Sequence, residues 1–173
     1  MAPGDSREAL LRVAVGERPA DLVVRGGALA NVYTGEVLDG WGVAVAGSRI
    51  ALIGPEAESC VGPSTTVIEA RGQVIAPGFV DGHTHLDFLH RLDRYLESAI
   101  PTGLTAFVTE TPVLCAAGGF PAVEAFLAHL PRLPITGFAT APTIAYLCSD
   151  RGDGQPMITL EEMARLLEEP AVL

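Results

Sequence analysis

The chain has 173 residues, of which 49% are hydrophobic, so it is long enough for one substantial core and is not disordered. Its 21 acidic and 11 basic residues give a formal net charge of −10, and no basic stripe could neutralise phosphates, which argues against a nucleic-acid partner. All the basic residues are arginine, which excludes lysine Schiff bases, phosphate-loop lysines and carbamylated metal bridges.

Signals for a membrane or a secreted protein are weak. No uninterrupted apolar run reaches the roughly 18–20 residues that span a bilayer, and residues 1–16 lack a basic start followed by an apolar core. We therefore expect a soluble, cytoplasmic protein with no membrane partner. Cys60, Cys115 and Cys148 are odd in number and far apart, which favours unbridged, mostly buried thiols.

The first predicted element is a helix over residues 5–15. Asp5 and Glu8 have the spacing of a capping box, the apolar residues form one face, and Gly16 can end the helix. We assign residues 1–20 to this element and expect it to dock on the domain that follows.

Residues 21–76 consist of short β-branched runs broken by glycine, which indicates a small β-sandwich or open barrel. Gly47-Ser48 suits a tight two-residue hairpin with glycine at its first central position. No phosphate-binding glycine motif is present, so these glycines indicate turns. The predicted strands cover 22–24, 28–32, 42–45, 50–53, 66–68 and 73–75.

From Phe79 onward, strand and helix patterns alternate. Thr159 and Glu162 form a predicted capping box that begins the last helix. The pattern gives about three and a half β/α units, so residues 77–173 predict the incomplete start of a (β/α)₈ barrel. The predicted strands lie near 79, at 104–108 and 135–141 and from 171, and the other predicted helices at 88–100 and 121–130.

Such a partial barrel would leave strand edges and helix faces uncovered. We therefore expect the chain to be a fragment, or one part of an assembly whose remainder is supplied by another chain.

The main chemical signal is the sequence A-P-G-F-V-D-G-H-T-H-L-D, from Ala76 to Asp87. Side chains alternate along a strand, so His83 and His85 can point the same way and bind one metal ion. They follow the first predicted barrel strand, and barrel active sites lie at the carboxyl ends of strands. A metal held there lowers the pKa of a bound water to about 7, which predicts hydrolytic chemistry.

Three carboxylates are candidates for supporting this metal site. Asp81 is expected to hydrogen-bond at the strand end or to fix the tautomer of a ligating histidine. Asp87 either faces the substrate or the metal, or caps a helix. Glu110 follows the second barrel strand and is either a site residue or a carboxylate on the rim. His90 and His129 are expected to be solvated or to cap helix ends.

The β-rich N-terminal segment, the motif P-G-F-V-D-G-H-T-H at residues 77–85 and the β/α units together resemble the amidohydrolase superfamily over essentially the whole chain. Within it, P-A-D-L-V-V-R-G-G at residues 19–27 and N-V-Y-T-G-E at residues 31–36 are similar to the opening of the adenine deaminase family. The sequence departs from that family in having Asp87-Phe88-Leu89 where glutamate and serines are usual, and Thr109-Glu110 in place of a His-Glu pair.

The resemblance implies that His83 and His85 are the first two ligands of a divalent metal centre, binuclear in the complete enzyme and containing zinc, iron or manganese. It places the remaining ligands and the catalytic groups beyond Leu173, so we expect the chain alone to be inactive. It also implies a nucleobase-like small-molecule substrate, and we expect either a homo-oligomer or a missing remainder of the chain.

The leading hypothesis is hydrolytic deamination of a purine base, adenine to hypoxanthine and ammonia. The first alternative is hydrolysis of a cyclic amide or an acylated amine. The second is a non-catalytic truncated or assembly subunit that keeps only the first part of the fold.

Overall fold

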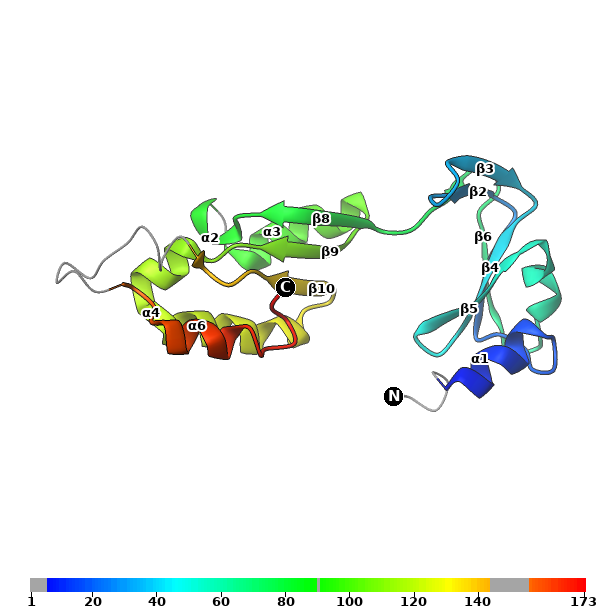
Figure 1. Cartoon of the computed structure of the whole chain (residues 1–173). Helices are drawn as coiled ribbons and strands as arrows, with labels where there is room; N and C mark the ends of the chain where they lie inside the picture. Colours follow the sequence, from blue (N-terminus) through cyan, green and yellow to red (C-terminus); the bar gives the residue numbers. More distant parts are fainter. Residues whose placement is uncertain (1–5, 90, 144–155) are drawn as a thin grey trace. The chain divides into compact units, whose positions relative to one another are not determined.

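The computed structural model describes residues 6–89, 91–143 and 156–173 (Figure 1). It is a mixed α/β structure with three sheets. The chain divides into two compact units, Met1–Pro77 and Gly78–Leu173. Asp5, His90 and Cys148, for which the sequence makes predictions, lie outside the described residues.

The N-terminal helix α1 (Arg7–Ala14) packs against one sheet of the first unit. Its N-cap is Ser6, not the expected Asp5, and the Ser6 hydroxyl accepts a hydrogen bond from the backbone N–H of Ala9 at 3.1 Å. Ser6 takes this position because its short side chain reaches the third N–H of the helix. Val13 is fully buried, in a core that also contains Val23 of the sheet.

Two sheets form the rest of the first unit, and all six predicted strands are present. A four-stranded sheet has the order β5-β4-β1-β6 and a three-stranded sheet the order β3-β2-β7 (Figure 1). The strands are β1 (Leu22–Arg25), β2 (Ala28–Asn31), β3 (Glu36–Asp39), β4 (Gly42–Ala46), β5 (Arg49–Gly54), β6 (Thr66–Glu69) and β7 (Val74–Ile75), with the short 3₁₀ helix η2 (Pro55–Cys60) after β5.

The sequence did not predict strand β3 of this unit, but it did predict the hairpin turn between β4 and β5. Strand β3 has acidic residues at both ends and is bounded by Gly35 and Gly40, both with positive φ, so it gave no β-branched run to recognise. The hairpin at Gly47-Ser48 is confirmed: Ala46 pairs with Arg49, and Gly47 has φ 59°. The Asp21 carboxylate accepts a 2.7 Å hydrogen bond from the Gly47 N–H, which stabilises the turn.

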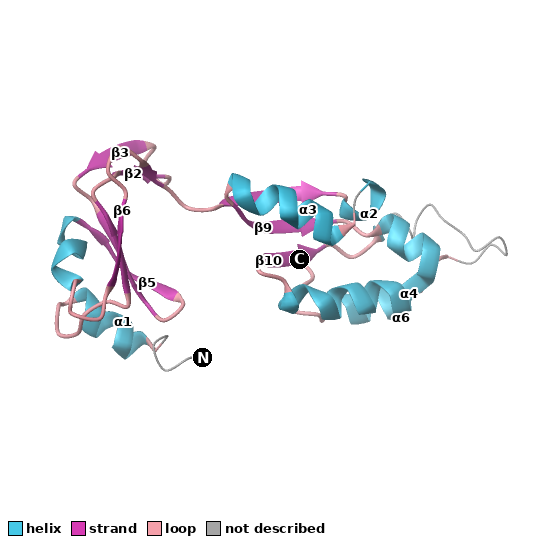
Figure 2. Ribbon diagram, turned by 180° about the vertical axis from the view of Figure 1, so that it is seen from behind, coloured by secondary structure: helices cyan, strands magenta, loops and turns pink. Residues whose placement is uncertain are grey.

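The second unit contains a three-stranded parallel sheet in the order β10-β9-β8, with helices between successive strands, as the sequence predicts (Figure 2). Val172 adds a parallel bridge to Ala139, close to the fourth strand expected from residue 171. The strands are β8 (Phe79–Thr84), β9 (Leu104–Thr109) and β10 (Thr136–Ala139); the helices are α2 (Leu86–Leu89), α3 (Leu92–Ala99), η3 (Ile100–Thr102), α4 (Pro112–His129), η4 (Leu130–Arg132) and α6 (Leu160–Leu166).

Two predicted helices of this unit have different bounds. Helix α4 begins at Pro112 instead of Pro121, because proline is tolerated in the first turn and Gly119, at φ 64°, kinks the helix ahead of Pro121. The helix predicted over residues 88–100 is divided into α2 and α3, since Arg91 is in an extended conformation. The predicted capping box of Thr159 and Glu162 is confirmed at the start of α6.

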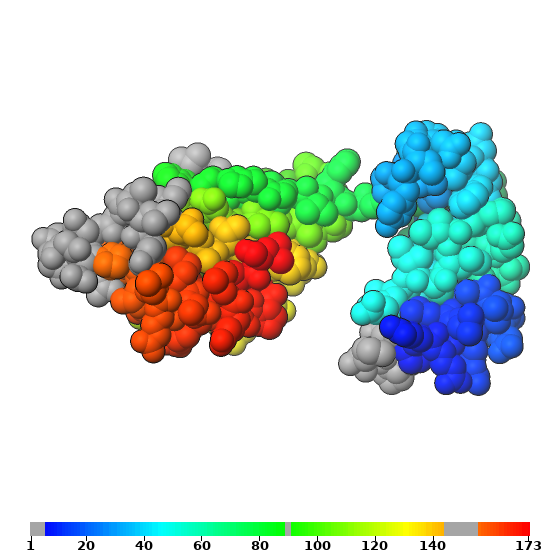
Figure 3. All heavy atoms as spheres, in the orientation of Figure 1, coloured from blue at the N-terminus to red at the C-terminus, as the bar shows by residue number. Residues whose placement is uncertain are grey.

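Helix α4 lies in the core of the second unit. By length and composition, residues 112–132 could cross a membrane, a test that the core helices of soluble proteins also pass. Phe120, Val123 and Leu127 of α4 are buried in one cluster with Phe107 of β9 and Leu166 of α6. The space-filling view shows α6, in orange and red, and β8 and β9, in green, as parts of one packed body (Figure 3). One face of α4 therefore packs in this core, although most of its residues are not buried.

Cys60 and Cys115 are buried and form no disulfide among the described residues, as expected.

Gly78 is the first residue of the second unit, and its backbone passes close to the side chain of Thr105 in β9. A Cβ at residue 78 would lie 2.7 Å from the Thr105 Cβ, an atom that cannot rotate away. We expect Gly78→Ala to destabilise the protein by about 1–3 kcal/mol, the usual range for overpacking, measured as a fall in Tm by circular dichroism. Gly82→Ala, where no atom lies within 4 Å of the new Cβ, is the control and should be within about 0.5 kcal/mol of wild type. Equal losses would contradict this explanation.

Candidate metal centre

The ends of β8 and β9 are joined by hydrogen bonds that set the position of the site. Thr84 is paired with Thr109, and the Glu110 N–H donates to the Thr84 carbonyl at 2.9 Å. The Leu86 N–H donates to the Thr109 hydroxyl at 3.2 Å. These bonds bring the chain after each strand to the same edge of the sheet, so His85 and Glu110 face each other there.

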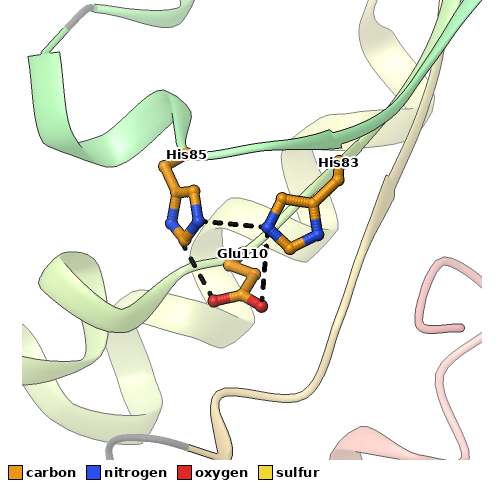
Figure 4. A group of neighbouring side chains, drawn as sticks. All are labelled: His83, His85 and Glu110. Atoms are coloured by element: carbon orange, nitrogen blue, oxygen red, sulfur yellow. Dashed lines mark hydrogen bonds and ion pairs between the residues drawn. The ribbon is translucent and has the colours of Figure 1, made fainter.

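His83 and His85 converge at this edge, and their Nε2 atoms lie 3.2 Å apart (Figure 4). Two nitrogens bound at about 2.0–2.1 Å to one tetrahedral zinc ion are about 3.3 Å apart. The imidazoles therefore have the separation that one shared ion requires.

Glu110 points toward both imidazoles (Figure 4). Its Oε1 lies 3.9 Å from His83 Nε2, and its Oε2 lies 3.9 Å from His85 Nδ1. One candidate ligand atom from each of the three residues lies within 4.8 Å of the others. Because 3.9 Å exceeds the separation of two ligands of one tetrahedral ion, Glu110 must shift slightly to join the two Nε2 atoms around that ion.

The donor set fits a divalent metal ion. Two imidazoles and one carboxylate suit zinc and other first-row ions, and three protein ligands leave a position open for a water or a substrate. His85 Nδ1 is buried without a hydrogen bond among the described residues, with the Glu110 carboxylate 3.9 Å away. Glu110 can thus serve in two ways, as a third ligand or as the acceptor for the Nδ1–H of a ligating His85.

Asp81 does not lie against an imidazole. Its Oδ1 accepts a 3.2 Å hydrogen bond from the backbone N–H of His83, and its Oδ2 accepts one from the Tyr95 hydroxyl at 3.3 Å. Asp81 is thus placed to support the backbone at the end of β8, the first of the two roles expected for it. Among the described residues, the carboxylate that faces the imidazoles is Glu110.

Asp87 lies in α2 and contacts the beginning of α4. Its Oδ2 accepts a 2.9 Å hydrogen bond from the backbone N–H of Leu114, in the first turn of that helix. This bond corresponds to the capping alternative for Asp87, although the capped helix is not its own. His129, in the last turn of α4, is exposed, as expected.

Tyr95 and Thr109 contribute to the site without having been predicted. Tyr95 of α3 donates to Asp81 from fourteen residues away, and Thr109 of β9 accepts from Leu86. Tyr95 carries no separate signal, because an aromatic residue on the apolar face of a helix is normally part of the core. Thr109 directly precedes Glu110 at a strand end, and this position is the only signal that points to it.

Comparison with solved structures identifies the class of fold. N-acyl-D-glutamate deacylase from Bordetella bronchiseptica, solved with zinc and a phosphonate inhibitor, is 21% identical with a TM-score of 0.55, over 78% of this chain and 32% of that protein. Molinate hydrolase is 18% identical with a TM-score of 0.52, over 72% of this chain and 30% of that protein. The fold is that of amidohydrolases. No family model matches the sequence.

Curated relatives give a more specific similarity, to adenine deaminases. The adenine deaminase of Moorella thermoacetica is 33% identical over 164 residues, which are 94% of this chain and 27% of the relative. That of Rubrobacter xylanophilus is 48% identical over 97 residues, which are 56% of this chain and 16% of the relative. The expected resemblance is confirmed, and the chain spans about a quarter of the Moorella protein's length.

The Tyr95–Asp81 hydrogen bond predicts a change in stability at alkaline pH. Burial, and secondarily the Asp81 carboxylate, raises the pKa of Tyr95 above its ordinary value of about 10. The neutral phenol is therefore favoured in the folded state. Its contribution is fully present below pH 10 and is lost as pH rises through the folded-state pKa.

We expect the denaturant midpoint of wild type to fall more steeply between about pH 9 and 11 than that of Tyr95→Phe, which cannot ionise. Tyr33→Phe, at a side chain that is 97% exposed, is the control and should follow the wild-type profile. A Tyr95→Phe profile identical to wild type would show that ionisation of the partly buried Tyr95 phenol is not linked to folding.

Proposed function

We propose that the chain is the N-terminal part of a metal-dependent hydrolase that deaminates adenine to hypoxanthine and ammonia. The observation that carries this proposal is the convergence of His83 and His85 on one point, in a chain that is 33% identical to an adenine deaminase over 94% of its length. Other similar proteins of the same name are 31–48% identical.

The proposed architecture is a β-rich N-terminal domain followed by the first three to four β/α units of a (β/α)₈ barrel. The parallel order β10-β9-β8, with intervening helices and a Val172 bridge to Ala139, supports it. We assign residues 1–20 to a docking helix, 21–76 to a β-sandwich and 77–173 to the barrel. The boundary between the two compact units, at Pro77, supports this division.

In the proposed site, His83 and His85 bind a metal ion through Nε2. When bound, a divalent ion such as zinc, iron or manganese supplies a Lewis acid that lowers the pKa of a bound water to about 7. Glu110 Oε2 lies 3.9 Å from His85 Nδ1; by moving closer it would accept a hydrogen bond from Nδ1–H and hold His85 in the tautomer that leaves Nε2 unprotonated. Asp81 fixes the backbone of His83.

The other components of the proposed enzyme lie outside this chain. We propose that they comprise the ligands of a binuclear centre and the groups that bind a nucleobase-like substrate, supplied by the rest of the protein or by another subunit. A homo-oligomer in the cytoplasm, with no nucleic acid or membrane partner, is part of the same proposal.

Measurement of zinc binding by the chain tests whether His83 and His85 are metal ligands. We expect His83→Ala and His85→Ala each to weaken zinc affinity by at least about 100-fold, since each removes a ligand, measured by competition with a chromogenic chelator. His129→Ala, at an exposed histidine outside the site, is the matched control and should bind as wild type does. If the three variants bind zinc equally, the proposed site is wrong.

A chimera tests the reaction. The chain would replace the matching segment of the Moorella thermoacetica adenine deaminase. Ammonia release would be measured with adenine, ring opening with cyclic amides, and release of the free amine with N-acyl amines. We expect ammonia from adenine, and none when the chimera carries His85→Ala. Hydrolysis of the amides alone would instead identify an amidohydrolase of different specificity. A folded chimera that binds no metal and turns over nothing would indicate a non-catalytic subunit.

A further inference from the structure

Asp87 connects the two segments that carry the candidate ligands. It follows His85 by two residues, while its hydrogen-bond partner Leu114 follows Glu110 by four. The bond from the Leu114 N–H to Asp87 Oδ2 is 2.9 Å long and partly buried. This hydrogen bond therefore connects the segment that follows β8 with the segment that follows β9, and it forms outside the metal centre itself.

Helix α4 depends on Asp87 for its N-terminal cap. Thr111 is in the N-cap position but forms no side-chain capping bond, and Pro112 has no N–H. The N–H groups of the first turn need acceptors, and a carboxylate there also interacts favourably with the helix dipole. Asp87 supplies both the acceptor and the charge, from a different helix.

The position of Glu110 follows from this contact. One end of its segment is held by the bond from its N–H to the Thr84 carbonyl. The other end continues through Thr111 and Pro112 into α4, whose first turn is bound to Asp87. Without the Asp87 carboxylate, the Thr84 bond would still hold the Glu110 backbone, but the start of α4 would keep only its apolar packing against α2 and lose its hydrogen bond to it.

We propose that Asp87 is a positioning residue of the metal centre, which holds Glu110 against His83 and His85 by capping α4. This inference rests on the proposed function, because it concerns the same metal ion. Asp87 lies outside the cluster of His83, His85 and Glu110, and it acts on the site through Leu114 and Glu110.

The test compares Asp87→Ala with Asp87→Asn in the full chain. Asparagine keeps an oxygen that can accept from Leu114, whereas alanine keeps none. We expect zinc affinity to fall about 10–100-fold in Asp87→Ala, the range found when a group supporting a ligand is removed, and to stay within about 3-fold in Asp87→Asn. Affinity is measured by chelator competition well below the lowest Tm of the set. Asp93→Ala, which removes an exposed carboxylate from the first turn of α3, is the control.

Each outcome decides the role of Asp87. Equal losses in both Asp87 variants would show that the site depends on the charge of the carboxylate and not on its hydrogen bond to Leu114, and would overturn the proposal. A lower Tm with unchanged zinc affinity in Asp87→Ala would make the role purely structural and also overturn it.

A second readout is independent of metal. Amide hydrogen exchange of Leu114, measured without metal, should speed up at least 10-fold in Asp87→Ala and little in Asp87→Asn, whereas that of Glu110, whose N–H donates to the Thr84 carbonyl, should change little in either variant. If wild type binds no zinc, the proposed function fails, and this exchange alone decides whether Asp87 holds the start of α4.

Discussion

The parallel pairing of β8 with β9 is the constraint on which the candidate centre depends. Parallel strands end at the same edge of a sheet, so residues that follow them meet although they are distant in sequence. The pairing of Thr84 with Thr109 sets this register, and the Glu110 N–H bond to the Thr84 carbonyl extends it by one residue. A register shift between Asp81 and Thr84 contains His83 and precedes His85. The separation of 3.2 Å between the two Nε2 atoms therefore depends on local backbone geometry as well as on strand alternation.

The sequence predicted most of the fold because the relevant signals are local. Apolar runs between glycines located six of the seven strands of the first unit, and the Thr159–Glu162 spacing located the start of α6. Strand β3 was missed because it presents Glu36 and Asp39 at its ends and only two apolar residues. The start of α4 was missed because Pro121 was taken as the first residue of the helix, whereas Pro112 occupies the first turn and the kink at Gly119 accommodates Pro121.

The candidate site was predictable to a different degree for each residue. The H-x-H motif after a predicted strand identified His83 and His85 as candidate metal ligands. The three carboxylates could be named from their positions at or after strand ends, but most of their partners could not. The Tyr95 hydroxyl, the Leu114 N–H and the two imidazoles lie on other elements than the carboxylates they face. Asp81, next to the histidines in sequence, binds a backbone N–H and a tyrosine, while the more distant Glu110 faces the imidazoles.

Packing has thus given three similar side chains three different tasks. Asp81 ties β8 to α3, Asp87 ties α2 to α4, and Glu110 is left pointing at the histidines. A carboxylate that already accepts from a backbone N–H is less available as a ligand, since binding a metal would compete with that bond. The two aspartates are therefore better suited to holding the site than to forming it. Glu110, whose carboxylate lies 3.9 Å from each ring, keeps its acceptor capacity for an ion or for the Nδ1–H of His85.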